Sequence, residues 1–327
     1  MRTLNSAIMN KFKYYFILII TGLFLFSCSK DDNSIETEPL RDFQDQFKAD
    51  NLIIEEYLDT YTFEVTNAPG QPEDQDVVFT KITDPVNQKK ISSFLNSPTF
   101  PKLLKKDVSL HDITYSVYYL VIREGSGESP CNVDEVLTSY RGQYLSKSTV
   151  NEVTTLTATE FEKVKHPESF FSLTGVIRGW GEVFPEFKVG TATSNDDGTV
   201  TYNDFGVGVM FLPSGLAYYN APQNGIPSYS PLVFNFKLYA LKRVDSEGDG
   251  ILSYLEDIDG DGYVYNDDTD TDGIPDYLDI DDDGDRFTTR SEITVNGIVT
   301  PFASIPDCSG DITTVGRKRK YLDSACH

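Results

Sequence analysis

The stretch that decides the fold is residues 171–180, which read Phe-Ser-Leu-Thr-Gly-Val-Ile-Arg-Gly-Trp. It ends in Trp180, the only tryptophan among 327 residues. Its first half alternates as a strand does, and the short amphipathic stretch 181–190 follows directly. A strand that delivers a large aromatic ring to the start of a short helix can form the floor of an apolar cleft. We therefore take Trp180 as the centre of a candidate pocket.

The composition describes a globular chain with one strongly acidic segment. Hydrophobic residues make up 39% and aromatic residues 13% of the chain, which supports a packed core. The length predicts about two domains. The net charge is −23, and residues 245–292 alone hold 18 acidic and 2 basic residues. This balance argues against nucleic acid as a partner, because phosphates require Lys and Arg, and it favours cations.

The region 113–243 has the two-residue period of strands. The expected strands are residues 115–122, 133–144, 170–177, 207–212 and 232–241, which are rich in β-branched and aromatic residues. One short helix is expected directly after Trp180. Many strands with a single short helix predict an α+β domain, in which an antiparallel sheet wraps around that helix.

Residues 41–112 are predicted to be an N-terminal extension that packs on this domain. Apolar residues recur at helical spacing over residues 41–63, which predicts a helix. Residues 77–82 have the composition of a strand, and residues 85–112 show little periodicity. We assign no function to this extension from its sequence.

Five motifs follow one another within residues 113–243. They are Val121-Ile-Arg-Glu-Gly-Ser-Gly127, Ser139-Tyr-Arg-Gly142, residues 171–180, Pro213-Ser-Gly-Leu-Ala-Tyr218, and Ile226-Pro227 with the strand 232–238. Together they resemble the FKBP-type peptidyl-prolyl isomerases, in which such motifs occur in this order. Each motif is weak alone, and the shared order of all five makes the resemblance specific.

The resemblance implies an aromatic cup that holds a proline ring, with Trp180 as its floor. The walls would be Tyr140, Phe171, Val176, Tyr218 and Phe234. The Ile177 backbone N–H and the Tyr218 hydroxyl would hold carbonyl groups of the peptide. The X–Pro bond turns slowly because amide resonance creates a barrier of ~18–20 kcal/mol. A dry aromatic cup favours the twisted, less polar bond, so no cofactor is expected for catalysis.

One pair of the family's cup residues has two candidate positions. An aromatic residue and an acid normally follow the strand of Tyr140 after a short hairpin. Phe161-Glu162 fits by its spacing to Phe171, but it requires a hairpin about ten residues longer than usual. Val150-Asn151 keeps the hairpin short and loses both the ring and the acid. We favour Phe161-Glu162.

Residues 244–292 contain a repeated pattern of acids. In the first repeat, Asp245, Glu247, Asp249 and Glu256 stand at positions 1, 3, 5 and 12, with glycine at position 6. This is the spacing of an EF-hand calcium loop. Three similar loops follow, the last with Arg286 in place of the glycine. The predicted metal ligands are Asp245, Glu247, Asp249, Glu256, Asp257, Asp259, Asp261, Asp268, Asp270, Asp272, Asp276, Asp279, Asp281, Asp283, Asp285 and Glu292.

The period of about 11–12 residues, with no flanking helices, resembles thrombospondin type 3 or dockerin-like calcium repeats more than paired EF-hands. The alternative is a solvated acidic linker, although an unstructured run would not keep Asp-x-Asp-x-Asp-Gly in phase. We expect structural Ca²⁺ that stiffens this segment. The affinity should be weak, with Kd of ~10⁻⁴–10⁻³ M, as in extracellular modules.

The N-terminus is predicted to target the chain to the cell envelope. Lys11 and Lys13 precede an apolar run that is too short to span a bilayer, which is typical of a signal peptide over residues 1–27. The run ends before Cys28 in a sequence that resembles a lipoprotein lipobox, so we expect lipid on Cys28 and a tether over residues 28–40. The alternative is an ordinary signal peptide with an incidental cysteine. The prediction is an outer-membrane lipoprotein, with its exposure at the cell surface left open.

The other cysteines lie in or near the C-terminal half. Cys308 and Cys326 are close enough in sequence to pair within the tail, residues 293–327, which leaves Cys131 as a buried thiol. Their spacings match no zinc site. Cysteine pairing fits an oxidising compartment.

Two functions remain open after this reading. The first is a peptidyl-prolyl isomerase at the cell envelope whose partners are proline-containing segments of client proteins. The second is a catalytically weak FKBP-fold lipoprotein used for binding or adhesion. Hydrolase and nucleotide-dependent functions are poor candidates, because the sequence shows neither a nucleophile motif near its histidines nor a glycine-rich phosphate loop.

Overall fold

The computed structural model describes residues 40–223 and 225–326. The predicted signal peptide, the lipidation site Cys28 and nearly all of the tether lie outside the described residues. Residues 42–327 belong to one compact unit. Within the described part of the chain, no helix is both long enough and apolar enough to cross a membrane.

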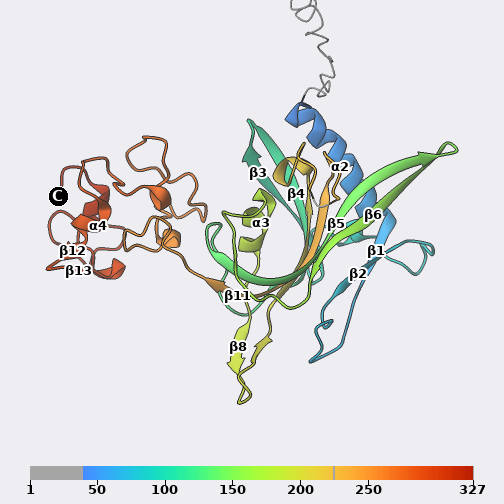
Figure 1. The fold of residues 1–327 in the computed structure, drawn as a ribbon, viewed down its shortest axis with the longest axis horizontal. Coiled ribbons are helices and arrows are strands. Elements are labelled where there is room, and N and C mark those ends of the chain that lie inside the picture. Colours follow the sequence, from blue (N-terminus) through green and yellow to red (C-terminus); the bar gives the residue numbers. More distant parts are fainter. Residues whose placement is uncertain (1–39, 224, 327) are drawn as a thin grey trace, which may run out of the picture. The chain divides into compact units, whose positions relative to one another are not determined.

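The main element is a curled antiparallel sheet of seven strands (Figure 1). Its strands run in the spatial order β3-β4-β10-β11-β5-β6, and β7 pairs with β5. Their bounds are β3 Lys102–Leu110, β4 Ile113–Arg123, β5 Glu135–Val150, β6 Val153–Val164, β7 Phe171–Ser172, β10 Gly206–Leu212 and β11 Leu232–Lys242. The mixed fold with a curled antiparallel sheet and few helices agrees with the α+β class expected from the sequence.

The smaller elements lie around this sheet. The helices are α2 Phe43–Thr60, α3 Arg178–Val183 and α4 Thr289–Glu292. Two-stranded pairs are formed by β1 Tyr61–Val65 with β2 Val77–Lys81, β8 Thr191–Ser194 with β9 Val200–Asn203, and β12 Thr294–Val295 with β13 Ile298–Val299. Single 3₁₀ turns are η1 Ile91–Phe94, η2 Phe184–Glu186, η3 Ser214–Leu216, η4 Ser253–Leu255, η5 Asp276–Leu278, η6 Phe302–Ser304 and η7 Lys320–Leu322.

Both faces of the sheet are covered, which is why its central strands are continuous apolar runs. Every residue of β10 is buried. Met210 and Leu212 point into the core cluster that contains α3. Val209 and Phe211 point into a second cluster that contains the apolar face of α2. Figure 1 shows α3 within the curve of the sheet and α2 along its other side.

Helix α2 forms where the sequence predicts a helix. Asp42 caps its N-terminus by accepting a hydrogen bond from the Asp45 N–H at 3.0 Å. Ile54, Tyr57 and Leu58 are buried, and their spacing places them on one face of the helix. The helix ends at Thr60, three residues before the predicted end, because the chain turns there into strand β1.

Strand β3 was not predicted, although it forms the edge of the main sheet next to β4. Its sequence, Lys-Leu-Leu-Lys-Lys-Asp-Val-Ser-Leu, carries three lysines and an aspartate. Charged residues of this kind protect an edge strand from pairing with other chains, and they also hide the apolar alternation. Leu103 and Val108 are the residues that this strand buries.

The strand predicted over residues 170–177 is wrong for most of its length, since only Phe171–Ser172 pair with β5. The chain then turns, and the Gly175 N–H donates to the Ser172 carbonyl at 3.0 Å. Ile177 is the N-cap of α3, with an extended backbone conformation. The turn brings the start of α3 across the sheet, and Trp180 is therefore directed into the core.

The C-terminal segment has a small core of its own that joins the acidic loops to the tail. Its buried residues are Ile251, Ile293, Ile305, Tyr321 and Leu322. The first of these lies in the first acidic loop, and the last two lie near the C-terminus. Residues 244–292 and the tail are therefore packed together rather than separate.

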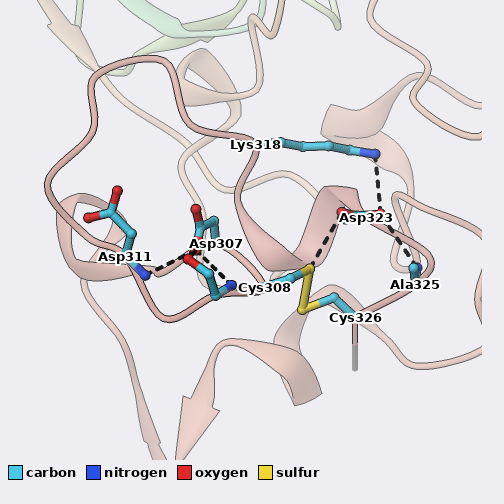
Figure 2. The surroundings of a disulfide bond; sticks show 8 residues. Asp307, Cys308, Asp311, Lys318, Asp323, Ala325 and Cys326 are labelled. Atoms are coloured by element: carbon cyan, nitrogen blue, oxygen red, sulfur yellow. Dashed lines mark hydrogen bonds and ion pairs between the residues drawn. A yellow bond between two sulfur atoms is a disulfide. The ribbon is translucent and has the colours of Figure 1, made fainter.

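Cys308 and Cys326 form a disulfide, as expected from the sequence, with their Cα atoms 5.5 Å apart (Figure 2). Asp323 lies beside the bridge, where its carboxylate is 3.6 Å from the Lys318 ammonium. Cys131 is a free, half-buried thiol, and burial raises its pKa to about 11. A thiol with so high a pKa is a poor nucleophile at neutral pH.

Candidate functional site

Trp180 is the floor of an aromatic cup. Its side chain is only 4% exposed. The rings of four aromatic residues meet it edge to face, with centroid distances of 4.9 Å to Tyr140, 5.7 Å to Phe171, 5.3 Å to Phe184 and 5.4 Å to Phe234. Edge-to-face packing is the favoured geometry for aromatic pairs, so these contacts fix the orientation of the indole.

Two glycines make room for this cluster. A Cβ atom on Gly179 would lie 2.5 Å from the Leu212 side chain, so glycine lets α3 approach β10 closely. A Cβ atom on Gly142 would lie 2.4 Å from the ring of Phe161. Gly142 therefore leaves the space in which Phe161 packs against Phe234, with ring centroids 5.6 Å apart.

The pair Phe161-Glu162 lies at the cup, and the alternative pair does not. The Tyr140 hydroxyl donates to Glu162 Oε2 at 2.8 Å. Val150 is 66% exposed at the far end of β5, and eight residues of strand place it ~26 Å from Gly142. The hairpin of β5 and β6 is long because both strands continue outward to a turn at residues 151–152, where φ is positive.

A bulge in this hairpin sets the direction of the two side chains. Gly142 pairs with Glu162, but the next residue, Gln143, pairs with Glu160. Phe161 is thus the extra residue of a β-bulge, which re-aims side chains that a regular ladder would direct elsewhere. Phe161 faces the core cluster, while Glu162 remains exposed at the rim.

The rim of the cup is half-exposed. Phe171, Val176, Ile177 and Tyr218 are all partly buried and pack against the core cluster that contains Trp180. Burial raises the pKa of Tyr218, and the charge of Glu162 adds to this effect. The phenol therefore stays protonated and can donate a hydrogen bond at any physiological pH.

The Ile177 backbone N–H lies at the same rim. Ile177 is the N-cap of α3, and it has no side-chain cap. Within the part of the chain that the structure describes, no acceptor is bonded to its N–H. A free donor beside an apolar floor is suited to hold a peptide carbonyl.

Two cup residues were missed by the sequence reasoning. Phe184 contacts Trp180 from within the short helical stretch, at the i+4 position, and this spacing was a usable signal. Ile226 is 3% exposed in the same cluster. Ile226-Pro227 was part of the last of the five motifs, but the burial of Ile226 depends on how the chain folds back before β11.

The loop that carries Tyr218 is held by the N-terminal helix. The Asp50 carboxylate is fully buried and accepts from the Ser214 N–H at 2.7 Å and from the Ser214 hydroxyl at 2.6 Å. The ring of Phe43, also on α2, stacks on Tyr219 with centroids 4.3 Å apart. Helix α2 therefore braces this wall of the cup from behind.

A cavity of about 220 Å³ lies beside β5, β11 and the loop between β1 and β2, and Tyr140 is among the residues that line it. Lys237 lines it, and its ammonium group pairs with Asp76 at 2.6 Å and donates to the Pro72 carbonyl at 2.7 Å. These contacts fasten the loop between β1 and β2 to the sheet.

The acidic segment contains four loops with the same geometry. The predicted ligands at positions 1, 3 and 5 converge in each loop, with one carboxylate oxygen of each within 4.8 Å of the others: Asp245, Glu247 and Asp249; Asp257, Asp259 and Asp261; Asp268, Asp270 and Asp272; Asp281, Asp283 and Asp285. In every loop the first aspartate accepts from the N–H of the sixth residue, at 2.9–3.1 Å. The repeat seen in the sequence is therefore a repeat in space.

The sixth residue of each loop has a left-handed backbone. The φ angles are 109° at Gly250, 85° at Gly262, 96° at Gly273 and 81° at Arg286. Glycine adopts this conformation without steric cost, whereas arginine does not. The fourth loop thus has the same shape as the others, although Arg286 disfavours the left-handed backbone conformation at this position.

The carboxylates of these loops are buried without enough partners. Leaving Asp285 aside, fourteen carboxylate oxygens between Glu247 and Glu292 are buried with no hydrogen bond among the described residues. Burial raises the pKa of Glu256 to about 11 and that of Glu247 to about 8, and neighbouring carboxylates add to this effect. Crowded oxygen ligands of this type fit a hard cation such as Ca²⁺.

The other predicted ligands take different places. Asp276 accepts from the Thr269 N–H at 2.7 Å, and Asp279 accepts from the Asp281 N–H at 2.9 Å, so both stabilise turns. Glu292 is buried, and burial raises its pKa to about 8, with Asp283 as the largest charge contribution. Glu256 lies with Asp249 and Asp282.

The sequence reasoning missed Asp267 and Asp282. Asp267 accepts from the N–H groups of Ile258 and Asp259, and its second oxygen is buried without a partner among the described residues. Asp282 joins a fifth cluster of three acids. Neither residue falls on the positions of the repeat, although both stand beside predicted ligands.

The second acidic loop contacts the helix that carries Trp180. The Arg178 guanidinium lies over the Tyr265 ring, 3.9 Å from its centroid, and its Nε donates to Glu182 Oε1 at 2.7 Å. The Tyr263 hydroxyl donates to the same oxygen at 3.1 Å. The outer side of α3 is therefore covered by residues of this loop.

Comparison with known proteins gives two partial matches. The family model described as "BamM C-terminal" matches residues 246–315, which span the acidic loops and part of the tail. Over 139 residues the chain is 27% identical to the FKBP-type peptidyl-prolyl cis-trans isomerase FkpA of Escherichia coli strain K12, and likewise to FkpA of Escherichia coli O157:H7. Each of these alignments covers 42% of this chain and 42% of the relative, so the chain spans less than half the length of the curated relatives it matches.

Solved structures of isomerases also match part of the chain. A peptidyl-prolyl cis-trans isomerase from Pseudomonas syringae pv. tomato DC3000 covers 62% of this chain and 98% of its own, with 15% identity and a TM-score of 0.33. FkpA from Escherichia coli covers 38% of this chain and 48% of its own, with 30% identity and a TM-score of 0.28. The chain is thus similar, over part of its length, to FKBP-type peptidyl-prolyl isomerases.

Proposed function

We propose that this protein is a peptidyl-prolyl cis-trans isomerase of the FKBP type that acts on proline-containing segments of client proteins. The observation that carries the proposal is the buried indole of Trp180, enclosed edge-on by four aromatic rings below a half-exposed rim. The partial similarity to FkpA supports the same reaction.

The cup accelerates rotation because its apolar surface favours the twisted X–Pro bond over the planar one. The planar X–Pro amide is polar and well solvated in water, and twisting it removes its resonance. An apolar floor at Trp180 disfavours the planar form more than the twisted form, so part of the barrier is removed. The Ile177 N–H and the Tyr218 hydroxyl hold carbonyls on either side, which keeps the proline ring over the indole. No covalent bond forms or breaks.

Glu162 contributes through Tyr140. Its carboxylate accepts from the Tyr140 hydroxyl at 2.8 Å, and this hydrogen bond fixes the ring that forms one wall. Burial, followed by this hydrogen bond, raises the pKa of Tyr140, so the phenol stays protonated. The negative charge at the rim also favours a peptide with a positively charged neighbour to the proline.

The test is an isomerisation assay with proline peptides on the soluble form that begins at Ser29. We expect catalysis by the wild type, and a loss of ~10-fold or more in kcat/KM for Trp180→Ala, which corresponds to about 1.4 kcal/mol. Tyr218→Phe should lose less, because it removes one hydrogen bond. Val86→Ala, at a residue that is 89% exposed, is the matched control and should match the wild type.

The second candidate, a binding or adhesion module, is separated by the same assay. The loop over the cup carries Ser228 and Tyr229, where the family resemblance leads us to expect a proline and a small residue. A wild-type rate at background, together with binding of proline peptides that Trp180→Ala abolishes, would favour the binding module.

For the C-terminal segment we propose structural calcium binding in thrombospondin type 3- or dockerin-like loops. The support is the fourfold repeat of converging carboxylates with buried, unpartnered oxygens. In each loop, two or three carboxylate oxygens together with backbone carbonyls and waters would complete the coordination that Ca²⁺ requires. Equilibrium dialysis with calcium is the direct test, and a chain that binds no calcium at several millimolar would contradict the proposal.

We propose further that the chain is a lipoprotein of the cell envelope, anchored in the outer membrane through Cys28. The support is the lipobox-like sequence before Cys28, with the Cys308–Cys326 disulfide as a sign of an oxidising compartment. Palmitate labelling of the wild type and of Cys28→Ala tests the anchor. Equal labelling of both would overturn it.

A further inference from the structure

We propose that Asp282 of the fourth acidic loop completes a buried cation site with Asp249 and Glu256 of the first loop, so that one Ca²⁺ joins the two loops. This inference rests on the proposed calcium function and adds to positions 5 and 12 of the first repeat a ligand that the repeat does not contain. One oxygen from each of the three carboxylates lies within 4.8 Å of the others. Asp249 and Glu256 belong to the first loop, and Asp282 follows Glu256 by 26 positions.

The three side chains are closed off from water. Asp249 is 3% exposed, Glu256 is 0% exposed and Asp282 is 1% exposed. Both oxygens of Glu256, both oxygens of Asp282 and Oδ2 of Asp249 have no hydrogen-bond partner among the described residues. Five buried oxygens without donors, on three carboxylates that each bring one oxygen to the same cluster, form a ligand set rather than a solvated acidic surface.

The position of Asp282 within its loop explains why it turns toward the first loop. Asp281 and Asp283, its neighbours, face the cluster of their own loop with Asp285. Consecutive side chains of an extended chain point to opposite sides, so Asp282 faces away from that cluster. The backbone N–H of Asp282 donates to the Thr289 hydroxyl at 3.3 Å.

An acid at this position occurs once in the four loops. The second residues of the first three loops are Ser246, Ile258 and Thr269, none of which is charged. Asp282 is therefore not required by the repeat. Asp282 is buried beside two buried acids of the first loop, and a cation that the two loops share would explain this arrangement.

The charge of the site requires a cation. Its three side chains are carboxylates, and all three are buried. The basic side chain near this site is Arg290, but its guanidinium donates to the Gly248 carbonyl at 2.9 Å. Ca²⁺ suits the site better than Mg²⁺, because it accepts an irregular set of carboxylate oxygens, whereas Mg²⁺ needs near-ideal octahedral geometry.

The site lies next to the small core of the segment. Tyr321 is fully buried in that core, with Asp282, Glu256 and Asp249 among the charged groups that act on it. Ile251 of the first loop and Ile293 after the fourth loop belong to the same core. An ion between the two loops would therefore hold the first loop, the fourth loop and the tail around one centre.

The test compares Asp282→Asn with the wild type in equilibrium dialysis and in thermal unfolding of the full chain. We expect the variant to bind one Ca²⁺ fewer. In calcium it should unfold at a lower temperature than the wild type, and in chelator at the same or a higher temperature, because it removes a buried charge. Asp307→Asn, at an acid outside the loops, is the control and should leave both measurements unchanged.

A second variant keeps the test decisive if Asp282→Asn folds poorly. Glu256→Gln removes a carboxylate that the first loop contributes to the site. The double variant with Glu256→Gln and Asp282→Asn should bind no fewer ions than Glu256→Gln alone, because both residues serve one site. The fluorescence of Trp180, the only tryptophan, reports whether the remainder is folded. An unchanged number of ions and unchanged unfolding in Asp282→Asn, or additive losses in the double variant, would overturn the shared site. A wild type that binds no calcium would instead reject the calcium proposal itself.

Discussion

The aromatic cup and the acidic loops differ in how their buried polar atoms are satisfied. Among the described side chains of the cup, Trp180 Nε1 is the buried polar atom without a partner. Among the described residues of the acidic loops, with Asp285 left aside, fourteen carboxylate oxygens lack one. The cup is closed by contacts between the protein's own apolar groups, and the loops are closed by groups that repel one another. The packing of the cup is thus complete as folded, whereas we propose that the loops take up a cation from solution.

The two regions should therefore respond to solution conditions in opposite ways. Burial of each large apolar side chain in the cup contributes about 1.5–3 kcal/mol and does not depend on ions. The stability of the acidic loops should depend on ions, because unpaired carboxylates are costly to bury until a cation neutralises them. The following predictions test this contrast.

The largest expected effect is that of calcium removal. In chelator the amides of residues 245–292 should lose protection from hydrogen exchange by two orders of magnitude or more, equivalent to about 3 kcal/mol. The amides of β10 and β11 should keep their protection, because they belong to the main sheet. Hydrogen exchange followed by mass spectrometry measures both regions in one sample. Equal loss of protection in both would remove the contrast.

The next effect is that of pH in chelator. The folded-state pKa values of Glu247 and Glu292, about 8 each, are raised above those of the unfolded chain, and that of Glu256 is about 11. The folded segment therefore binds more protons than the unfolded chain, and its stability falls as pH rises from about 4.5 through 8 and beyond. We expect the unfolding temperature of the segment to drop by an amount on the order of 10 °C between pH 5 and pH 9.

Calcium is the control for this pH series. A bound cation replaces the protons as the partner of the carboxylates, so the fall with pH should be absent at saturating calcium. A segment whose stability rises with pH in chelator would show that these carboxylates are solvated, contrary to the structure.

A smaller effect is expected at the brace behind the cup. Asp50→Ala removes the buried acceptor of the Ser214 N–H and hydroxyl, and leaving such donors unpaired costs about 1–3 kcal/mol. Because Ser214 precedes Tyr218 in the same loop, the variant should also raise KM in the isomerase assay. Asp45→Ala, on the exposed part of α2, is the matched control. Equal KM values in Asp50→Ala and the control would mean that the brace only stabilises the fold.

The smallest effect is a gain in stability at Arg286. Its φ of 81° costs an L-residue about 1–2 kcal/mol relative to glycine. Arg286→Gly should therefore stabilise the fourth loop by about 1 kcal/mol, and the calcium-loaded segment should unfold at a higher temperature. An unchanged or lower unfolding temperature would indicate that the Arg286 side chain makes contacts that offset its backbone strain.

The sequence predicted most of the cup because its residues lie on a few regular elements. Tyr140 lies on β5 and Phe234 on β11, two strands whose apolar alternation is visible in the sequence, and Trp180 follows a strand-like stretch. Local periodicity therefore located these residues. Strand β3 was missed because its lysines mask the alternation. Only two residues of the strand predicted before Trp180 are extended in the sheet, because a turn at Gly175 redirects the chain.

Contacts between distant residues were beyond any local pattern. Asp50 and Ser214 are 164 residues apart, and the brace that they form has no signal in either segment alone. Asp282 was missed for the same reason, since the spacing rule finds ligands within one loop. The repeat itself was visible because each loop is built from consecutive residues.

The most direct test of the central claim is the isomerisation assay with proline peptides, performed on the wild type and on Trp180→Ala in calcium and in chelator. We expect the wild type to catalyse the reaction in both conditions, because the cup needs no ion, and Trp180→Ala to lose ~10-fold or more in kcat/KM in both. A wild type at the uncatalysed rate, or a Trp180→Ala variant with the wild-type rate, would contradict it.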